Sequence, residues 1–208
     1  MSEHEHFRAA YAEGATPPWD IGRPQPALIE VGRRGWVRGA VLDDGCGTGE
    51  HALHFAAAGC DVVGVDVVPA AIERAIAKAA ERRLFNPPRF IVADVLRDPE
   101  ALAGRTFDTV VDMGFFHTLS DEQRSAWRVV LAGILKPGGS YVMVCFSELV
   151  PGGFGPRRIS EAEIRETFAE DAGFVVADLE RASILSMRDD APVEIPGWLA
   201  RIEQRGRS

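Results

Sequence analysis

Short runs of apolar, mostly β-branched residues alternate with helical patterns along much of the chain after residue 39. Nearly continuous apolar strands separated by helices are typical of a parallel sheet that is covered on both faces. The alternation therefore predicts an α/β fold built on a doubly wound sheet. The predicted strands are residues 40–44, 61–66, 89–94, 107–113 and 140–146.

Two serines mark the starts of predicted helices in the second half of the chain. Ser120 stands three residues before Gln123, and Ser160 stands three residues before Glu163. This is the spacing of a capping box, in which each side chain of the pair binds the backbone amide of the other residue. The pattern thus predicts one helix after each serine.

The chain after residue 148 loses the regular alternation. A loop rich in glycine and proline leads to the second capped helix, and residues 174–182 have the apolar, β-branched character of a strand. Residues 195–206 fit either a short helix or an edge strand. The pattern here predicts one further strand and leaves the last segment open.

The charge and cysteine content disfavour several classes of partner. With 31 acidic and 23 basic residues the net charge is −8, so the surface repels phosphate backbones and we expect no nucleic-acid partner. Cys46, Cys60 and Cys145 lack metal-ligand spacing, which predicts reduced thiols and no metal site. No run approaches the roughly 18 apolar residues of a spanning helix, so we expect a cytoplasmic protein with no membrane partner.

Three alternating glycines follow the first predicted strand and open the first helix. Gly45, Gly47 and Gly49 place backbone amides and a helix N-terminus at the carboxyl edge of the sheet, where open α/β folds bind ligands. Dinucleotide sites use the spacing G-x-G-x-x-G, and a phosphate-binding P-loop needs a following lysine and hydroxyl residue. The glycines therefore indicate a cofactor, and they disfavour nicotinamide dinucleotides.

Residues 43–49 resemble the acid-x-G-x-G-x-G first motif of class I S-adenosylmethionine-dependent methyltransferases, and further motifs follow in the family's order over roughly residues 38–146. The resemblance implies a Rossmann-like sheet of seven strands, the last antiparallel, with S-adenosylmethionine as cofactor and S-adenosylhomocysteine as product. Asp44 departs from the family, which usually has an apolar residue there. The resemblance also implies a set of cofactor-binding residues, of which the first belongs to the N-terminal segment described next. They are Trp19, Asp43, Gly45, Cys46, Gly47, Gly49, Asp66, Val67, Asp94, Val95 and Asp112.

The N-terminal segment is similar to the lid of the thiopurine and thiol methyltransferase branch and of its bacterial small-molecule relatives. Trp19, Gly22 and Pro24 match a Trp-x-x-Gly-x-Pro pattern that folds over the cofactor in those relatives. The resemblance implies that Trp19 packs on the methionine part of the cofactor, although it also suits a loop anchor. We expect one methyltransferase domain over residues 1–208, with a lid over 1–38 and a catalytic core over 39–208.

The methyl acceptor is expected to be a small molecule, because the chain has no large insertion and lacks the Asn/Asp-Pro-Pro-aromatic motif of enzymes that methylate nucleic-acid bases. A thiol or other soft nucleophile is favoured, since a thiol ionises near neutral pH without a strong base. The alternatives are an aromatic oxygen or nitrogen acceptor of quinone, hydroxyquinoline or natural-product type, and a protein that binds the cofactor without catalysis. The oligomeric state is left open.

Four residues follow strand ends on the acceptor side of the predicted site. His117 is the one histidine placed to act as a base, and a structural role is favoured over catalysis. Phe115, Phe116 and Phe146 are candidates for the wall of the acceptor pocket, and each fits the core equally well.

Overall fold

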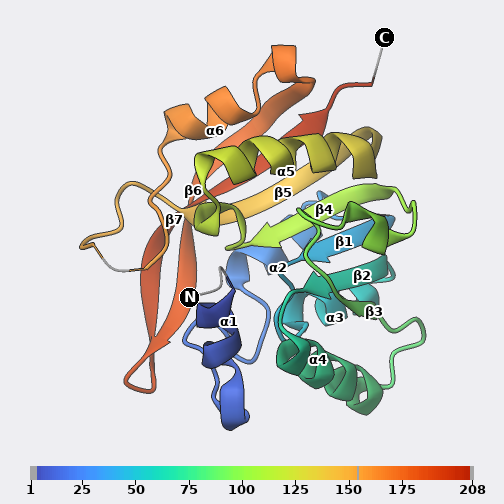
Figure 1. The fold of residues 1–208 in the computed structure, drawn as a ribbon, viewed down its shortest axis with the longest axis vertical. Coiled ribbons are helices and arrows are strands. Elements are labelled where there is room, and N and C mark those ends of the chain that lie inside the picture. Colours follow the sequence, from blue (N-terminus) through green and yellow to red (C-terminus); the bar gives the residue numbers. More distant parts are fainter. Residues whose placement is uncertain (1–3, 154, 207–208) are drawn as a thin grey trace.

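The computed structural model describes residues 4–153 and 155–206, which form a mixed sheet of seven strands in the order β3-β2-β1-β4-β5-β7-β6 (Figure 1). Strands β1 to β5 pair in parallel, and β7 runs antiparallel to both β5 and β6. The predicted α/β fold is therefore confirmed. The strands are β1 Ala40–Asp44, β2 Asp61–Asp66, β3 Arg89–Val92, β4 Phe107–Met113, β5 Leu135–Phe146, β6 Phe174–Arg188 and β7 Ala191–Gln204.

Helices cover both faces of the sheet, as a doubly wound fold requires. Leu28 of α2 and Phe55 of α3 pack with Val41 and Val142 on one face, and Trp127 of α5 and Ile164 of α6 join the core on the other. The α-helices are α1 Glu5–Ala10, α2 Pro26–Arg33, α3 Glu50–Ala57, α4 Pro69–Arg82, α5 Asp121–Ile134 and α6 Glu161–Thr167. Short 3-10 helices are η1 Ala12–Gly14, η2 Pro99–Leu102, η3 Phe116–Thr118 and η4 Glu170–Ala172.

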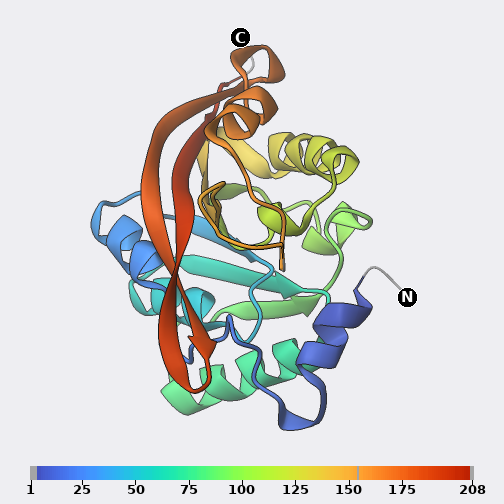
Figure 2. The same cartoon turned by 90° about the vertical axis from the view of Figure 1, so that its left-hand side faces the viewer.

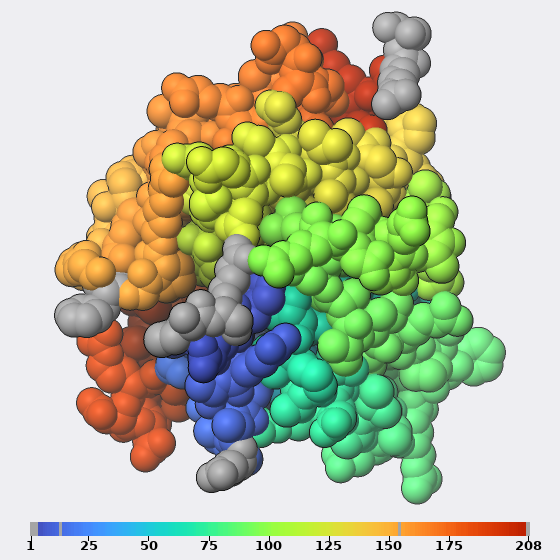
Figure 3. Space-filling model, in the orientation of Figure 1, coloured from blue at the N-terminus to red at the C-terminus, as the bar shows by residue number. Residues whose placement is uncertain are grey.

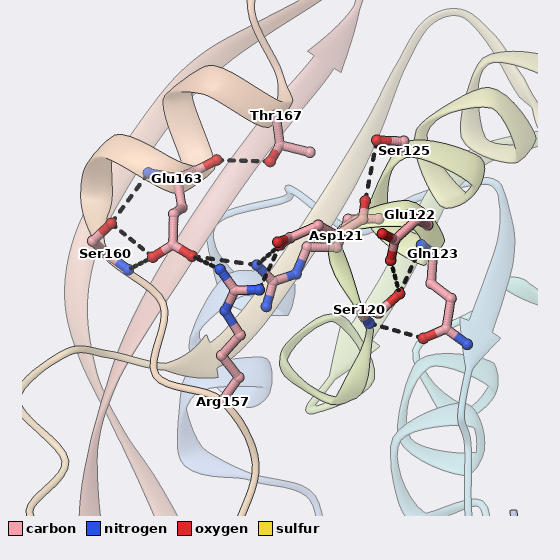
Figure 4. Close-up of polar contacts among 10 residues, drawn as sticks. Ser120, Asp121, Glu122, Gln123, Ser125, Arg157, Ser160, Glu163 and Thr167 are labelled. Atoms are coloured by element: carbon pink, nitrogen blue, oxygen red, sulfur yellow. Dashed lines mark hydrogen bonds and ion pairs between the residues drawn. The ribbon is translucent and has the colours of Figure 1, made fainter. Parts of the chain in front are cut away.

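Both predicted capping boxes are present, at the starts of α5 and α6 (Figure 4). The hydroxyl of Ser120 accepts from the backbone amide of Gln123 at 3.3 Å, and that of Ser160 accepts from the amide of Glu163 at 3.2 Å. Arg157, in the loop before α6, forms ion pairs with Asp121 and Glu163 and so links the two helix starts (Figure 4).

The C-terminal strands differ from the sequence-based expectation. Residues 195–206 were open between a short helix and an edge strand, but β7 is an inner strand and β6 forms the edge. The apolar side chains of Trp198, Leu199, Ala200 and Ile202 explain this position, because all four are buried. Strand β5 also begins earlier than predicted, at Leu135, and its pairing with β4 shifts register before Ser140.

Strands β6 and β7 form a long hairpin whose tip lies beside the N-terminal segment (Figure 1, Figure 2). The backbone amide of Met187 donates to the carbonyl of Pro18 at 2.7 Å. The buried side chain of Gln25 donates to the carbonyl of Leu185 at 2.8 Å and accepts from its amide at 2.9 Å. In the space-filling view, the blue N-terminal residues fill the space between the red hairpin and the teal residues of α4 (Figure 3). The hairpin thus anchors the N-terminal segment.

Candidate active site

The glycine loop joins β1 to α3 at the carboxyl edge of the sheet, and Asp66 at the end of β2 holds it there. Gly45 and Gly47 have positive φ angles of 64° and 53°, a conformation that costs glycine little. The amide of Gly47 donates to Asp66 Oδ2 at 2.9 Å, and the amide of Val68 donates to Oδ1 at 2.9 Å. Burial raises the pKa of Asp66, while these amides oppose the shift. The loop and the acid are therefore joined by hydrogen bonds at the carboxyl edge of the sheet.

Gly49 has a packing role that the glycine spacing alone did not reveal. A Cβ atom at this position would lie 2.8 Å from the ring of Phe90 on β3 and 2.9 Å from the Cβ of Ala75 on α4. Its φ angle of 82° also favours glycine. Gly49 is therefore the residue of the loop against which α4 and β3 pack.

Two neighbouring carboxyl groups are buried at the end of β1. Asp43 is 1% exposed and Asp44 is 3% exposed, and Oδ2 of each has no hydrogen-bond partner among the described residues. Burial raises the pKa of Asp43 to about 8, and the amide of Ala52 opposes the shift. Burial and the charge of Asp112 raise the pKa of Asp44 well above its usual range. A cationic ligand would relieve both groups.

Asp112, near the end of β4, is better satisfied than the two acids of β1. It accepts the amides of Phe115 at 2.7 Å and Phe116 at 2.9 Å, and it accepts the hydroxyl proton of Tyr141 from β5. Burial raises its pKa to about 6, and these hydrogen bonds oppose the rise. The carboxyl edge between β1 and β4 therefore gathers three carboxyl groups at the point where the strand order reverses.

A second part of the site lies where β2 and β3 end. Val67, Asp94 and His4 are among the residues that line a pocket of about 260 Å³, and Val95 beside it is 3% exposed. His4 Nε2 lies 3.0 Å from Asp94 Oδ2, so the start of the described N-terminal segment covers this pocket. Phe7 and Val67 both pack against a small buried cluster of Tyr11, Val68 and Ala71.

Tyr11, which sequence reasoning missed, connects the N-terminal segment to the glycine loop. Its hydroxyl would lie 2.8 Å from a Cβ atom on Gly47, and it accepts a hydrogen bond from Trp19 Nε1 at 3.1 Å. Trp19 itself is 40% exposed. The hydroxyl of Thr48 in the loop donates to Asp20 Oδ2 at 2.7 Å. The only sequence signal for Tyr11 was an aromatic residue eight positions before Trp19.

His117 lies on η3 and bridges to the end of β5. Its Nδ1 accepts the amide of Phe146 at 2.9 Å, and its carbonyl accepts the amide of Arg157 at 3.1 Å. Burial lowers the pKa of His117 to about 3, and the nearby Arg124 guanidinium lowers it further. A neutral imidazole that accepts at Nδ1 carries its proton at Nε2. This geometry suits a residue that positions its neighbours.

The remaining candidates occupy different surroundings. Phe115 and Phe146 are half-buried, whereas Phe116 is fully buried and its ring contacts Phe168 at 5.7 Å between centroids. Phe116 is thus a core residue here. Cys46 is 5% exposed, and burial raises the pKa of its thiol well above its usual range. Among the residues that the structure describes, no cluster of three metal-ligating side chains occurs.

Comparison with known proteins identifies the family to which this chain is similar. The family described as "Methyltransferase domain" matches residues 41–139. The chain is 34% identical to a 2-heptyl-1-hydroxyquinolin-4(1H)-one methyltransferase of Mycobacteroides abscessus, over 89% of this chain and 88% of that protein. It is 30% identical to probable thiol methyltransferase 2 of Arabidopsis thaliana, over 78% of this chain and 72% of that protein.

The fold agrees with these sequence matches. A solved structure described by the words "Conversion of a Disulfide Bond into a Thioacetal Group during Echinomycin Biosynthesis" superposes with a TM-score of 0.86 at 31% identity, covering 98% of this chain and 94% of the other. The chain therefore belongs to the class I S-adenosylmethionine-dependent methyltransferases. It is an enzyme of that family, and its cofactor is S-adenosylmethionine. No helix in the described part of the chain has the length and apolar character needed to cross a membrane.

The described site suits this cofactor chemically. S-adenosylmethionine carries a sulfonium and an ammonium group, and the edge between β1 and β4 offers unpartnered carboxyl oxygens at Asp43 and Asp44. A Cβ at Gly47 would lie 2.8 Å from the hydroxyl of Tyr11, so only glycine allows the N-terminal segment to approach the loop this closely. Unpartnered carboxyl oxygens, a tightly turned glycine loop and a cover from the N-terminal segment suit a small cationic cofactor.

Proposed function

We propose that this enzyme methylates a small aromatic acceptor that carries an acidic hydroxyl group, of the hydroxyquinolone type. The observation that carries the proposal is the similarity to the Mycobacteroides enzyme, which extends over 89% of this chain and so reaches well beyond residues 41–139. The sequence pattern favoured a thiol, and the aromatic acceptor was its alternative. Because this similarity covers most of the chain, we now rank the aromatic acceptor before the thiol.

The cofactor would supply an electrophilic methyl group on its sulfonium. We assign its binding to the loop amides and acids of the carboxyl edge, with Asp66 for the ribose hydroxyls and Asp94 and Val95 for the adenine. The N-terminal segment would act as the lid of a single domain, with Trp19 reaching the loop through Tyr11 and excluding water. The complete proposed set is Trp19, Asp43, Gly45, Cys46, Gly47, Gly49, Asp66, Val67, Asp94, Val95 and Asp112.

The state of His117 supports an acceptor that needs no enzymatic base. Its Nδ1 is already engaged by the amide of Phe146, and burial lowers its pKa to about 3, so it is a poor proton acceptor. A hydroxyl on the nitrogen of a quinolone ring ionises readily, because the negative charge spreads to the ring carbonyl. The enzyme would then mainly orient the anion against the methyl group, which can lower a barrier by about 7–11 kcal/mol.

A thiol or thiocyanate acceptor is the second candidate, supported by the similarity to the Arabidopsis thiol methyltransferase. Thiocyanate is an anion and a thiol is partly ionised near neutral pH, so both fit the same absence of a base. Half-buried Phe115 and Phe146 would border either acceptor. An aromatic ring would gain more from them, because aromatic pairs contribute about 0.5–1.5 kcal/mol beyond simple burial.

The test is S-adenosylhomocysteine formation by the purified enzyme with four acceptors. They are 2-heptyl-1-hydroxyquinolin-4(1H)-one, the same quinolone without the N-hydroxyl group, a small thiol, and thiocyanate. We expect turnover of the N-hydroxy compound and at least a hundredfold less with its deoxy analogue. Turnover confined to the thiol and thiocyanate would favour the second candidate, and no turnover with any aromatic hydroxyl compound would overturn the first.

Two variants separate the positioning role of His117 from a role as base. Asparagine can accept the amide of Phe146 in place of Nδ1, so His117→Asn should keep kcat within about tenfold, whereas His117→Ala should raise the acceptor KM. General-base catalysis contributes about 10²–10⁴-fold. A loss of that size in both variants, with unchanged affinity for S-adenosylhomocysteine, would make His117 the base.

A further inference from the structure

Asp44 is a buried carboxyl group that the transfer reaction does not require. It ends β1, is 3% exposed, and leaves Oδ2 without a hydrogen-bond partner among the described residues. The family pattern usually has an apolar residue here. An unpaired buried carboxyl group is costly, so a chain that carries one at the ligand-binding edge has a reason for it in the bound state.

The sheet register places Asp44 beside a second acid. Asp44 on β1 is the direct partner of Asp112 on β4, and partners in adjacent strands point to the same face. Asp112 accepts three hydrogen bonds, from two amides and from Tyr141, and these stabilise its negative charge. Asp44 has no comparable set of donors. Of the two carboxyl groups, Asp44 is therefore the one that holds a proton when no cation is nearby.

The other charged groups around Asp44 have the same sign. Asp43 comes from the same strand, Asp66 from β2 and Asp112 from β4, and each of them raises the pKa of Asp44. Tyr141 on β5 also interacts with it, and its hydroxyl group is neutral because burial raises its pKa well above the usual range. A cation placed at this edge would favour the anionic form of Asp44, which the neighbouring acids oppose.

We propose that Asp44 and Asp112 form a carboxyl pair that distinguishes the cationic cofactor from the uncharged sulfur of the product by exchanging one proton with solvent. The two ligands differ at their sulfur atom, where S-adenosylmethionine carries an additional methyl group and one positive charge. When the sulfonium binds, Asp44 releases its proton to solvent and becomes anionic. When the methyl group has left, the sulfur is a neutral thioether, and the pair takes one proton back from solvent. This inference concerns the cofactor alone and does not depend on the acceptor.

The proposal makes the preference for cofactor over product depend on pH. Because binding of S-adenosylmethionine would release one proton more than binding of S-adenosylhomocysteine, the ratio of their affinities should rise up to about tenfold per pH unit while Asp44 is protonated in the free enzyme. The effect would weaken product inhibition at higher pH.

The experiment is calorimetry of each ligand with the full-length enzyme, without acceptor, between pH 6 and 8. Measurement in two buffers of different ionisation enthalpy gives the number of protons released. We expect S-adenosylmethionine to release about one proton more than S-adenosylhomocysteine, because any proton that Asp43 loses to the ammonium group is lost with both ligands. Asp44→Val, which restores the apolar residue of the family, and Asp44→Asn should both reduce the difference to about zero and flatten the affinity ratio against pH.

Glu100→Gln is the matched control, because it removes an exposed carboxylate from η2. It should leave proton release unchanged. Equal proton release for the two ligands in the wild type would overturn the proposal, as would a pH-dependent ratio that persists in either Asp44 variant. If Asp44→Val does not fold, Asp44→Asn carries the same test, since it keeps the shape of the side chain.

Discussion

Replacing Gly49 by alanine tests whether this glycine is required for packing between the loop and its neighbours. The new Cβ would lie 2.8 Å from the Phe90 ring and 2.9 Å from Ala75 Cβ, closer than carbon atoms approach without movement. The positive φ angle of 82° adds backbone strain. Left-handed backbone costs about 1–2 kcal/mol for a residue with a Cβ, and overpacking costs about 1–3 kcal/mol. We expect the free energy of unfolding to fall by about 2–5 kcal/mol.

Gly173→Ala provides the matched control. Gly173 has φ 83° and ψ 19°, compared with φ 82° and ψ 14° at Gly49, but a Cβ there meets nothing within 4 Å. The control should therefore show the backbone cost alone. Urea unfolding of both variants measures the difference, and thermal unfolding should show Tm about 2–4 °C lower for each kcal/mol lost. Equal losses in the two variants would refute the packing argument.

Two further perturbations follow from buried polar groups. Because burial raises the pKa of Asp43 to about 8, the folded cofactor-free protein holds a proton that the unfolded chain has lost. Stability should therefore fall by about 1 kcal/mol between pH 6.5 and 8. The loss from Asp43 alone is about 2 kcal/mol, and part of it is offset because His51 and His117, whose pKa burial lowers in the folded protein, still lose protons in the unfolded chain over this range. Urea midpoints that stay flat or rise would contradict this. Gln25→Ala leaves both backbone groups of Leu185 unpaired and should cost about 2 kcal/mol while speeding proteolysis of the N-terminal segment. An unchanged digestion rate would show that the hairpin does not anchor that segment.

Much of the architecture could be predicted because its signals are local. The strand at 61–66 and the two capping serines depend on periodicity and spacing within a few residues, and all three are present as predicted. The fold class followed from the alternation of strand and helix patterns. The identity of the cofactor followed from the resemblance of residues 43–49 and the later motifs to those of a known family.

The misjudged features depend on contacts between distant parts of the chain. The last segment read equally well as helix or edge strand, and only its burial between β5 and β6 made it an inner strand. Likewise, the roles of Tyr11 over Gly47 and of Gly49 against Phe90 depend on the docking of segments that no short spacing relates.

The amino-acid sequence by itself determined the family, the doubly wound sheet and the position of the glycine loop, because each of these depends on residue patterns over short stretches of the chain. The tertiary structure decided which groups share a burial environment. It placed Asp44 beside Asp112 across a sheet register and engaged the Nδ1 of His117 with the end of β5. Such pairings arise when strands and loops far apart in the chain are brought together, and burial then changes the charge that each group carries.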